Sequence, residues 1–250
     1  MRELLSWEIA SFVLLALGCS AWEWLRPGWR VDRLAGLKLD LASFAVAVIF
    51  ALVSREILAA TRDGLPPLAT AAWVQTLRSL PFAAKLLIGL LLVDFTIYWV
   101  HRAQHAVALA WRSHRWHHSA EQMYWLAGFR TSFLHSFVYN IPQTVVPTHL
   151  LELSPLECGI GYSIGLFVQF WDHTNARGRI GCLKYLLVRP QDHRLHHAAV
   201  PGRVVNFGFV FSLWDRCFGT YADGDCTEEY ALGLGERVDP RSVPRMMLGV

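Results

Sequence analysis

Long apolar runs constrain the fold of this chain more than any other feature. They cover residues 4–22, 37–60 and 86–100, and the third, LLIGLLLVDFTIYWV, leads directly into His101. A helix needs about 20 predominantly apolar residues to cross the hydrocarbon core of a bilayer. Because every backbone polar group must be paired inside lipid, an apolar run of this kind forms a helix rather than an open strand. The sequence therefore predicts three membrane helices.

Two weaker apolar runs follow, at residues 133–151 and 156–171; Pro142 and Pro147 interrupt the first, and Pro155 separates it from the second. We expect them to form a helical hairpin that enters the bilayer and returns. Between the second and third runs, RDGLPPL at residues 62–68 predicts a loop, and Trp73 suits an interfacial segment. After Asp172 the chain becomes polar. The expected fold is an all-α integral membrane bundle of four to five spans or re-entrant helices, with a helical cap.

Basic residues in short loops indicate which side of the membrane the cap occupies. The segment between the first two runs is the richest in them, with Arg26, Arg30, Arg33 and Lys38. Such segments stay in the cytoplasm. Alternating spans then place the end of the third helix, and the cap that follows it, on the cytoplasmic side.

Composition excludes two other classes of protein. The net charge is only +3 and the charged residues are dispersed among apolar runs, so a nucleic-acid binder is not indicated. Five cysteines, an odd number with no CxxC spacing, argue against a disulfide framework and against a thiolate zinc site.

Histidine is distributed very unevenly along the chain. All eleven histidines lie between His101 and His197, and eight fall in three short motifs, HRAQH at 101–105, HRWHH at 114–118 and HRLHH at 193–197. Residues three or four apart lie on one face of a helix, so each motif directs two or three imidazoles towards one point. Neutral imidazoles that share metal ions explain this clustering, and imidazole suits iron, zinc, copper and nickel. Eight nitrogens exceed the needs of one ion, so two ions are expected.

Three further histidines lie outside these motifs. His173, in FWDHTN, is a candidate ninth ligand, with a capping or hydrogen-bonding role as the alternative. His149 should lie at the far end of the hairpin. His135 should begin a helix near the site, where a structural role is favoured over contact with a ligand ring.

Ligand imidazoles need their second nitrogen held, usually by a carboxylate or a carbonyl. Asp94, Asp192 and Asp215 are the expected holders, with Asp172 a further candidate. Asp94 interrupts an apolar helix two turns before His101, and a carboxylate inside a membrane segment is costly unless it has a function. A structural partnership with a cap arginine is the alternative for Asp94.

Metals beside a bilayer favour oxidative chemistry, because side chains alone do not oxidise an unactivated C–H bond. The sequence has no GxGxxG loop, so we expect electrons to come from another protein. A zinc hydrolase and a membrane metal carrier are the alternatives. Hydrolytic dimetal sites usually include bridging carboxylates, and carriers place their ligands near the bilayer midplane. A haem protein would need only two to four histidines on facing helices.

Several motifs together resemble the fatty acid hydroxylase/sterol desaturase superfamily of membrane di-iron enzymes. They are DFTIYWVHRAQH at 94–105, WRSHRWHHS at 111–119, RPQDHRLHH at 189–197 and NFGFVFSLWDRCFGTY at 206–221. The resemblance covers about residues 86–221, which we take as a catalytic domain between membrane helices at 1–85 and a tail at 222–250. The segment after Arg130 lacks the His-Pro-x-Glu often present in that family.

The resemblance implies an oxidoreductase that uses O2 to hydroxylate or desaturate a lipid, with an external ferredoxin- or cytochrome-type electron donor. It implies two iron ions, which zinc can replace in purified protein. The implied ligands are His101, His105, His114, His117, His118, His173, His193, His196 and His197. No catalytic residue beyond the ligands is implied. The resemblance is compatible with sterols, carotenoids, fatty acyl chains and ether lipids as substrates.

Overall fold

The computed structural model describes residues 2–61, 71–200, 204–225 and 230–250. Within these ranges the chain is helical, and β-structure is limited to two isolated bridges between single residue pairs. The all-α prediction is therefore confirmed for the described part of the chain. The loop predicted at residues 62–68 lies outside the described residues. The described cysteines form no disulfide with one another; they are Cys19, Cys158, Cys182 and Cys217.

Three described helices are long and apolar enough to cross a membrane: α1 (Arg2–Leu25), α2 (Arg33–Thr61) and α4 (Phe82–Ala106). They match the three predicted runs. Large apolar side chains on these helices point outwards; Leu14 and Leu17 are 70% and 65% exposed. Exposed apolar faces of this extent need a lipid environment. The protein is an integral membrane protein.

The predicted hairpin is present as two successive helices joined by a turn. α6 (Phe133–Val145) continues through a π-helical turn, η5 (Val146–Leu150), and α7 (Pro155–His173) follows it. Ser154 and Glu157 form a capping box at the start of α7, which pairs backbone donors that the helix leaves free there. The short helix α3 (Ala72–Arg78) lies beside the turn η5, where Arg78 donates to the carbonyls of His149 and Leu150. Whether the hairpin enters a bilayer stays a prediction.

Aromatic side chains join the membrane helices to the following loop. α1 packs against α7, and α2 packs against α6. Phe12 of α1 stacks on Phe44 of α2, with ring centroids 5.0 Å apart. Trp125, in the 3-10 helix η4 (Trp125–Phe129), stacks on Phe170 of α7 at 4.9 Å. Burial of these large rings fixes η4 and the end of α7 against the bundle.

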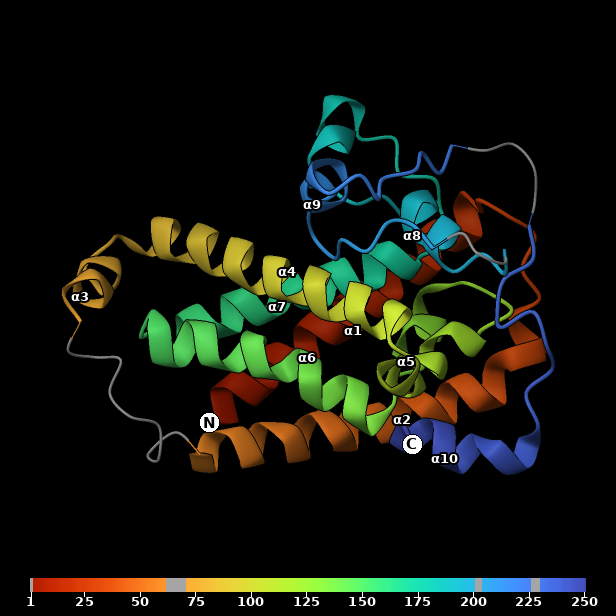
Figure 1. The fold of residues 1–250 in the computed structure, drawn as a ribbon, viewed down its shortest axis with the longest axis horizontal. Helices are drawn as coiled ribbons and strands as arrows, with labels where there is room; N and C mark the ends of the chain where they lie inside the picture. The colour runs from red at the N-terminus through yellow and green to blue at the C-terminus, as the bar shows by residue number, and fades with distance from the viewer. Residues whose placement is uncertain (1, 62–70, 201–203, 226–229) are drawn as a thin grey trace.

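Short elements cover one end of the long helices and, at α9, the middle of α4 (Figure 1). They are α5 (Ala108–Arg115), η3 (His117–Ser119), η6 (Gly181–Tyr185), α8 (Pro190–His196), α9 (Leu213–Cys217), η7 (Pro240–Ser242) and α10 (Val243–Leu248). α8 and α9 lie beside α4 in this view, far from α3. The C-terminal α10 returns to pack on α5 and α6. This arrangement brings together the segments that carry the nine predicted ligand histidines, whereas His149 lies near α3.

Candidate metal centre

The structure gathers all nine predicted ligand histidines into two groups. The first histidine group contains His101, His105, His114, His118 and His196. The second histidine group contains His117, His173, His193 and His197. Within each group, one ring nitrogen per residue lies within 4.8 Å of all the others. The groups are neighbours, because His118 and His197 stack with ring centroids 4.3 Å apart. His149 belongs to neither group.

Each HxxHH motif divides between the two groups, which differs from the expectation that a motif points to one place. The first and last histidines of a motif, four residues apart, stay together, as His193 and His197 do. The residue between them, His196, goes to the other group. The helix α5 ends at Arg115 and tightens into 3-10 geometry, and α8 ends at His196. The chain therefore sends adjacent imidazoles in different directions, and both motifs contribute to both groups.

Backbone carbonyls hold the second nitrogen of four rings. The Nδ1–H groups of His101 and His196 donate to the carbonyls of Phe207 and Val205, each at 2.8 Å. His117 donates to Arg130 O at 3.2 Å, and His173 to Gln169 O at 2.9 Å. A carbonyl only accepts, so the proton lies on Nδ1 and the Nε2 lone pair is free.

These lone pairs face one another at distances that suit a shared cation. The Nε2 atoms of His117 and His173 are 3.2 Å apart, and both rings carry their proton on Nδ1. Two acceptors at this separation repel unless a cation lies between them. Ligand nitrogens about 2.1 Å from one metal ion and at right angles to each other are about 3.0 Å apart. The Nε2 atoms of His101 and His105 have no hydrogen-bond partner among the described residues. The residues present therefore fit a metal in each group.

Burial keeps these imidazoles neutral, which is the state that binds metal. It holds the pKa of the ligand imidazoles in α5, η3 and α8 well below the usual value, and neighbouring histidines lower it further. These are His114, His117, His118, His193, His196 and His197. A low pKa means that the ring nitrogens do not bind protons at neutral pH in competition with a metal ion.

None of the three predicted carboxylate holders contacts a ligand ring, which corrects that expectation. Asp94 instead accepts from the backbone of Val210 and Phe211 at 2.7 and 3.0 Å and from the Trp214 indole at 2.9 Å. It therefore ties α4 to the loop before α9. The alternative expected for Asp94, a cap arginine, is not its partner among the described residues either. Asp192 pairs with Arg189.

Asp215 acts on a ligand through one intervening residue. Its carboxylate accepts from the amides of Phe207 and Gly208 at 2.7 and 2.8 Å. The carbonyl of Phe207 is the one that holds His101. The structure thus replaces a direct carboxylate–imidazole contact by a carboxylate–amide contact and a carbonyl–imidazole contact in series.

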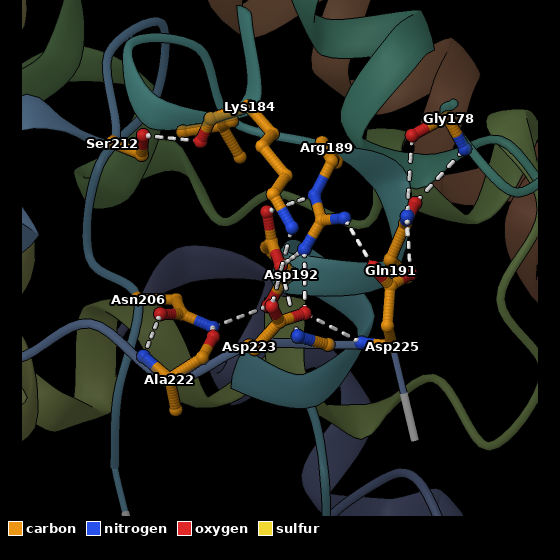
Figure 2. A network of polar contacts seen from close by, with 12 residues as sticks. Gly178, Lys184, Arg189, Gln191, Asp192, Asn206, Ser212, Ala222, Asp223 and Asp225 are labelled. Atoms are coloured by element: carbon orange, nitrogen blue, oxygen red, sulfur yellow. Dashed lines mark hydrogen bonds and ion pairs between the residues drawn. The ribbon is translucent and has the colours of Figure 1, made fainter. Parts of the chain in front are cut away.

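A charge network orients α8, which carries the candidate ligands His193 and His196 and is followed directly by His197 (Figure 2). Arg189 donates two hydrogen bonds to Asp192, at 2.8 and 2.7 Å, and also pairs with Asp223 and Asp225. Asn206, held at φ +59°, donates to the carbonyl of Asp192. The start of α8 and the segment 206–225 are thereby held together, and with them the carbonyls that orient His101 and His196.

We expect Arg189→Gln to lower the free energy of unfolding by about 3–5 kcal/mol, because it leaves the buried Asp192 carboxylate without its cation. The side chains of Arg189 and Asp192 are 3% and 2% exposed, so water screens the pair little. Denaturation of the purified protein in detergent measures the change. Arg241→Gln removes an exposed pair with Asp239 and should have no measurable effect. Equal stability of the two variants would contradict this role of Arg189.

Two residues of the site were not predicted from the sequence. His135, which the sequence analysis assigned a structural role, lies with its Nδ1 3.1 Å from Nδ1 of His114 and accepts a 3.4 Å contact from Gln104. His135 therefore accepts the Nδ1–H of His114, as the backbone carbonyls accept the Nδ1–H of four other ligand rings. Gly128 leaves space for His173, since a Cβ there would lie 2.5 Å from that ring. A histidine just after the helix cap Ser132 was the available signal for His135.

The segment that carries both histidine groups matches a known protein family. The profile of the family described as fatty acid hydroxylase matches residues 86–220, more than half of the chain. The chain belongs to this family. The matched segment contains all nine ligand candidates, whereas α1 and α2 lie before it.

Curated relatives are similar over parts of their length. The chain is 32% identical to an alkylglycerol monooxygenase of Xenopus tropicalis over 139 residues, which are 52% of this chain and 28% of the relative. It is 29% identical to the ornithine lipid hydroxylase OlsE of Rhizobium tropici, over 63% of this chain and 48% of the relative. It is 31% identical to the fatty acid hydroxylase vlmA of a Lecanicillium species, over 64% and 47%. The chain thus spans less than half the length of these relatives. No solved structure matches it.

Proposed function

We propose that this protein is a membrane-bound di-iron oxygenase that uses O2 to hydroxylate a lipid C–H bond. One observation carries the proposal: two adjacent histidine groups of metal-binding geometry lie inside the segment that matches the fatty acid hydroxylase family. Relatives with monooxygenase and hydroxylase names support hydroxylation, and a similar sterol 5(6)-desaturase from Neurospora crassa keeps desaturation open as a second outcome. The substrate class we propose is a lipid that reaches the site from the bilayer.

The proposed site holds one iron ion in each histidine group. When bound, the iron pair would supply the activation of O2 that side chains cannot supply. The chain orients the ligands through the carbonyls of Val205, Phe207 and Arg130, and buries the rings away from water. Because the ligand set found in the described part of the chain has no carboxylate, the site differs from the hydrolytic dimetal sites of the alternative function. Electrons would come from an external ferredoxin- or cytochrome-type protein.

Topology completes the proposal. We infer four to five spans or re-entrant helices: α1, α2, α4 and the hairpin α6–α7, with residues 1–85 as membrane helices. The catalytic domain then comprises residues 86–221, and residues 222–250 form a tail. The basic segment at Arg26 and Arg30 supports a cytoplasmic position for the cap and its metals.

Lipid profiling of cells with and without the gene, combined with metal analysis of the purified protein, tests the function. We expect a lipid product that gains oxygen from labelled O2 in the presence of the protein, and about two iron ions per chain. Zinc bound in stoichiometric amounts, with product formation that does not depend on O2, would favour the hydrolase alternative. Absence of both metal and an oxygenated product would exclude the oxygenase.

A further inference from the structure

We propose that Asp40, in the membrane helix α2, positions the ligand His117 through Arg130 and so couples α2 to the second histidine group. The inference rests on the proposed metal site, and goes beyond it by assigning a role to a helix outside the matched segment 86–220. Asp40 is a positioning residue in this proposal, since it contacts neither a ligand ring nor a reacting atom.

The first step is a buried ion pair between α2 and the loop after η4. The Arg130 Nε–H donates to one carboxylate oxygen of Asp40, and the Tyr124 hydroxyl donates to the other at 2.5 Å. The side chains of Arg130 and Asp40 are 8% and 1% exposed. A carboxylate placed in an apolar helix is costly unless it is paired, so this pair fixes the position of Arg130 relative to α2.

The second step links Arg130 to the second histidine group. Its own carbonyl accepts the Nδ1–H of His117 at 3.2 Å, which leaves Nε2 of His117 facing His173. Its guanidinium also donates to the carbonyl of Ser119 at 3.2 Å, at the end of the 3-10 helix that carries His117. Arg130 is therefore held by Asp40 on one side and holds the ligand segment at two points on the other.

Among the ligand rings, Arg130 contacts only His117 of the second histidine group, although η3 also carries His118 of the first group. In the first group, Phe207 holds His101, Val205 holds His196, and His135 lies against His114. None of these contacts includes Asp40 or Arg130. Loss of the Asp40 charge should therefore loosen the metal position of the second group much more than that of the first.

The decisive experiment is a metal titration of the full chain in lipid nanodiscs, with Fe2+ under anaerobic conditions and with Zn2+. We expect Asp40→Asn to weaken one of the two sites by about 10- to 100-fold, the usual effect of losing support around a ligand. His117→Ala identifies that site, because it should lose the same one. Tyr124→Phe is the matched control: it removes a hydroxyl donor to Asp40, keeps the ion pair, and should bind both ions as wild type does.

A second variant disturbs the pair without removing a charge, in case Asp40→Asn does not fold. A Cβ at Gly36, one turn before Asp40 in α2, would lie 2.9 Å from Nη2 of Arg130 and 3.2 Å from Oδ2 of Asp40. Alanine favours helix over glycine, so Gly36→Ala should keep α2 intact. We expect it to weaken the same site severalfold. Gly18→Ala, where a Cβ meets nothing within 4 Å, is its control and should change neither site.

The possible results separate this inference from the proposed function. Wild-type affinity at both sites in Asp40→Asn and in Gly36→Ala would overturn the coupling while the metal centre stands. Equal weakening of both sites would overturn it too, because a general loss of structure would then be the cause. A wild-type protein that binds no transition metal would remove the metal site and the coupling together.

Discussion

His117→Ala is expected to lose the metal of the second histidine group and to lower product formation by more than about 100-fold, while the protein stays in the membrane. Loss of a residue that only supports a ligand already weakens metal binding by about 10- to 100-fold, so loss of the ligand itself should cost more. His117 lies in η3, outside the three candidate spans, so its removal leaves the membrane helices unchanged. Metal analysis and lipid profiling of the variant measure both effects.

His149→Ala is the matched control for this prediction. His149 lies in the turn between α6 and α7, where its Nδ1 is 2.7 Å from the Thr148 hydroxyl, and it belongs to neither histidine group. We expect this variant to keep both metal ions and full turnover. If His117→Ala retained two ions and normal turnover, the assignment of His117 as a ligand would have to be abandoned.

The sequence predicted the membrane helices and the set of clustered histidines because both depend on local spacing. An apolar run long enough to span lipid has one stable conformation, a helix. Histidines four residues apart, such as His101 and His105, share a face whatever the rest of the fold does. The structure therefore confirms both features: α4 is a long apolar helix, and its two histidines belong to the first group.

The supporting contacts could not be predicted because they carry no residue-type signal. The carbonyls of Phe207, Val205 and Arg130 hold ligand rings, and any residue has a carbonyl. Which carbonyl reaches which ring depends on long-range packing. The split of each HxxHH motif was also missed, because it depends on where α5 and α8 change from α-helical to tighter geometry.

Acidic residues in the first two helices also indicate contacts between these helices and the segments around the site. Asp40 lies in the second apolar run and Glu23 directly after the first, so the reasoning applied to Asp94 holds for both residues. Glu23 accepts from the amides of Trp125 and Asn175 at 2.9 and 2.8 Å, and so ties α1 to the segments on either side of the site. A carboxylate that interrupts an apolar helix is thus a general signal of a tie between the membrane helices and the cap.

Removal of metal is expected to destabilise the fold strongly, because the ligand rings are arranged for cations and not for one another. The Nε2 atoms of His173 and His193 are 3.1 Å apart, and those of His118 and His196 are 3.0 Å apart. His196 and His173 each donate their Nδ1 proton to a carbonyl. Each of the two Nε2–Nε2 pairs therefore has at most one proton between its nitrogens. Without a cation the buried rings must turn or take up water, which weakens the packing around them.

The size of this effect follows from mass action. An ion at a free concentration about 100-fold above its Kd stabilises the folded state by about 2.7 kcal/mol, so two ions contribute about 5 kcal/mol. For a chain of this length that is a fall in Tm of roughly 10–20 °C when a chelator removes both. Thermal unfolding with and without chelator, with residual metal measured in each sample, tests the prediction.

In His117→Ala the same chelator should produce about half of the shift, since one ion remains to be removed. An unchanged Tm in wild-type protein proven free of metal would show that the histidine groups pack without cations, and the basis for a metal centre here would be lost.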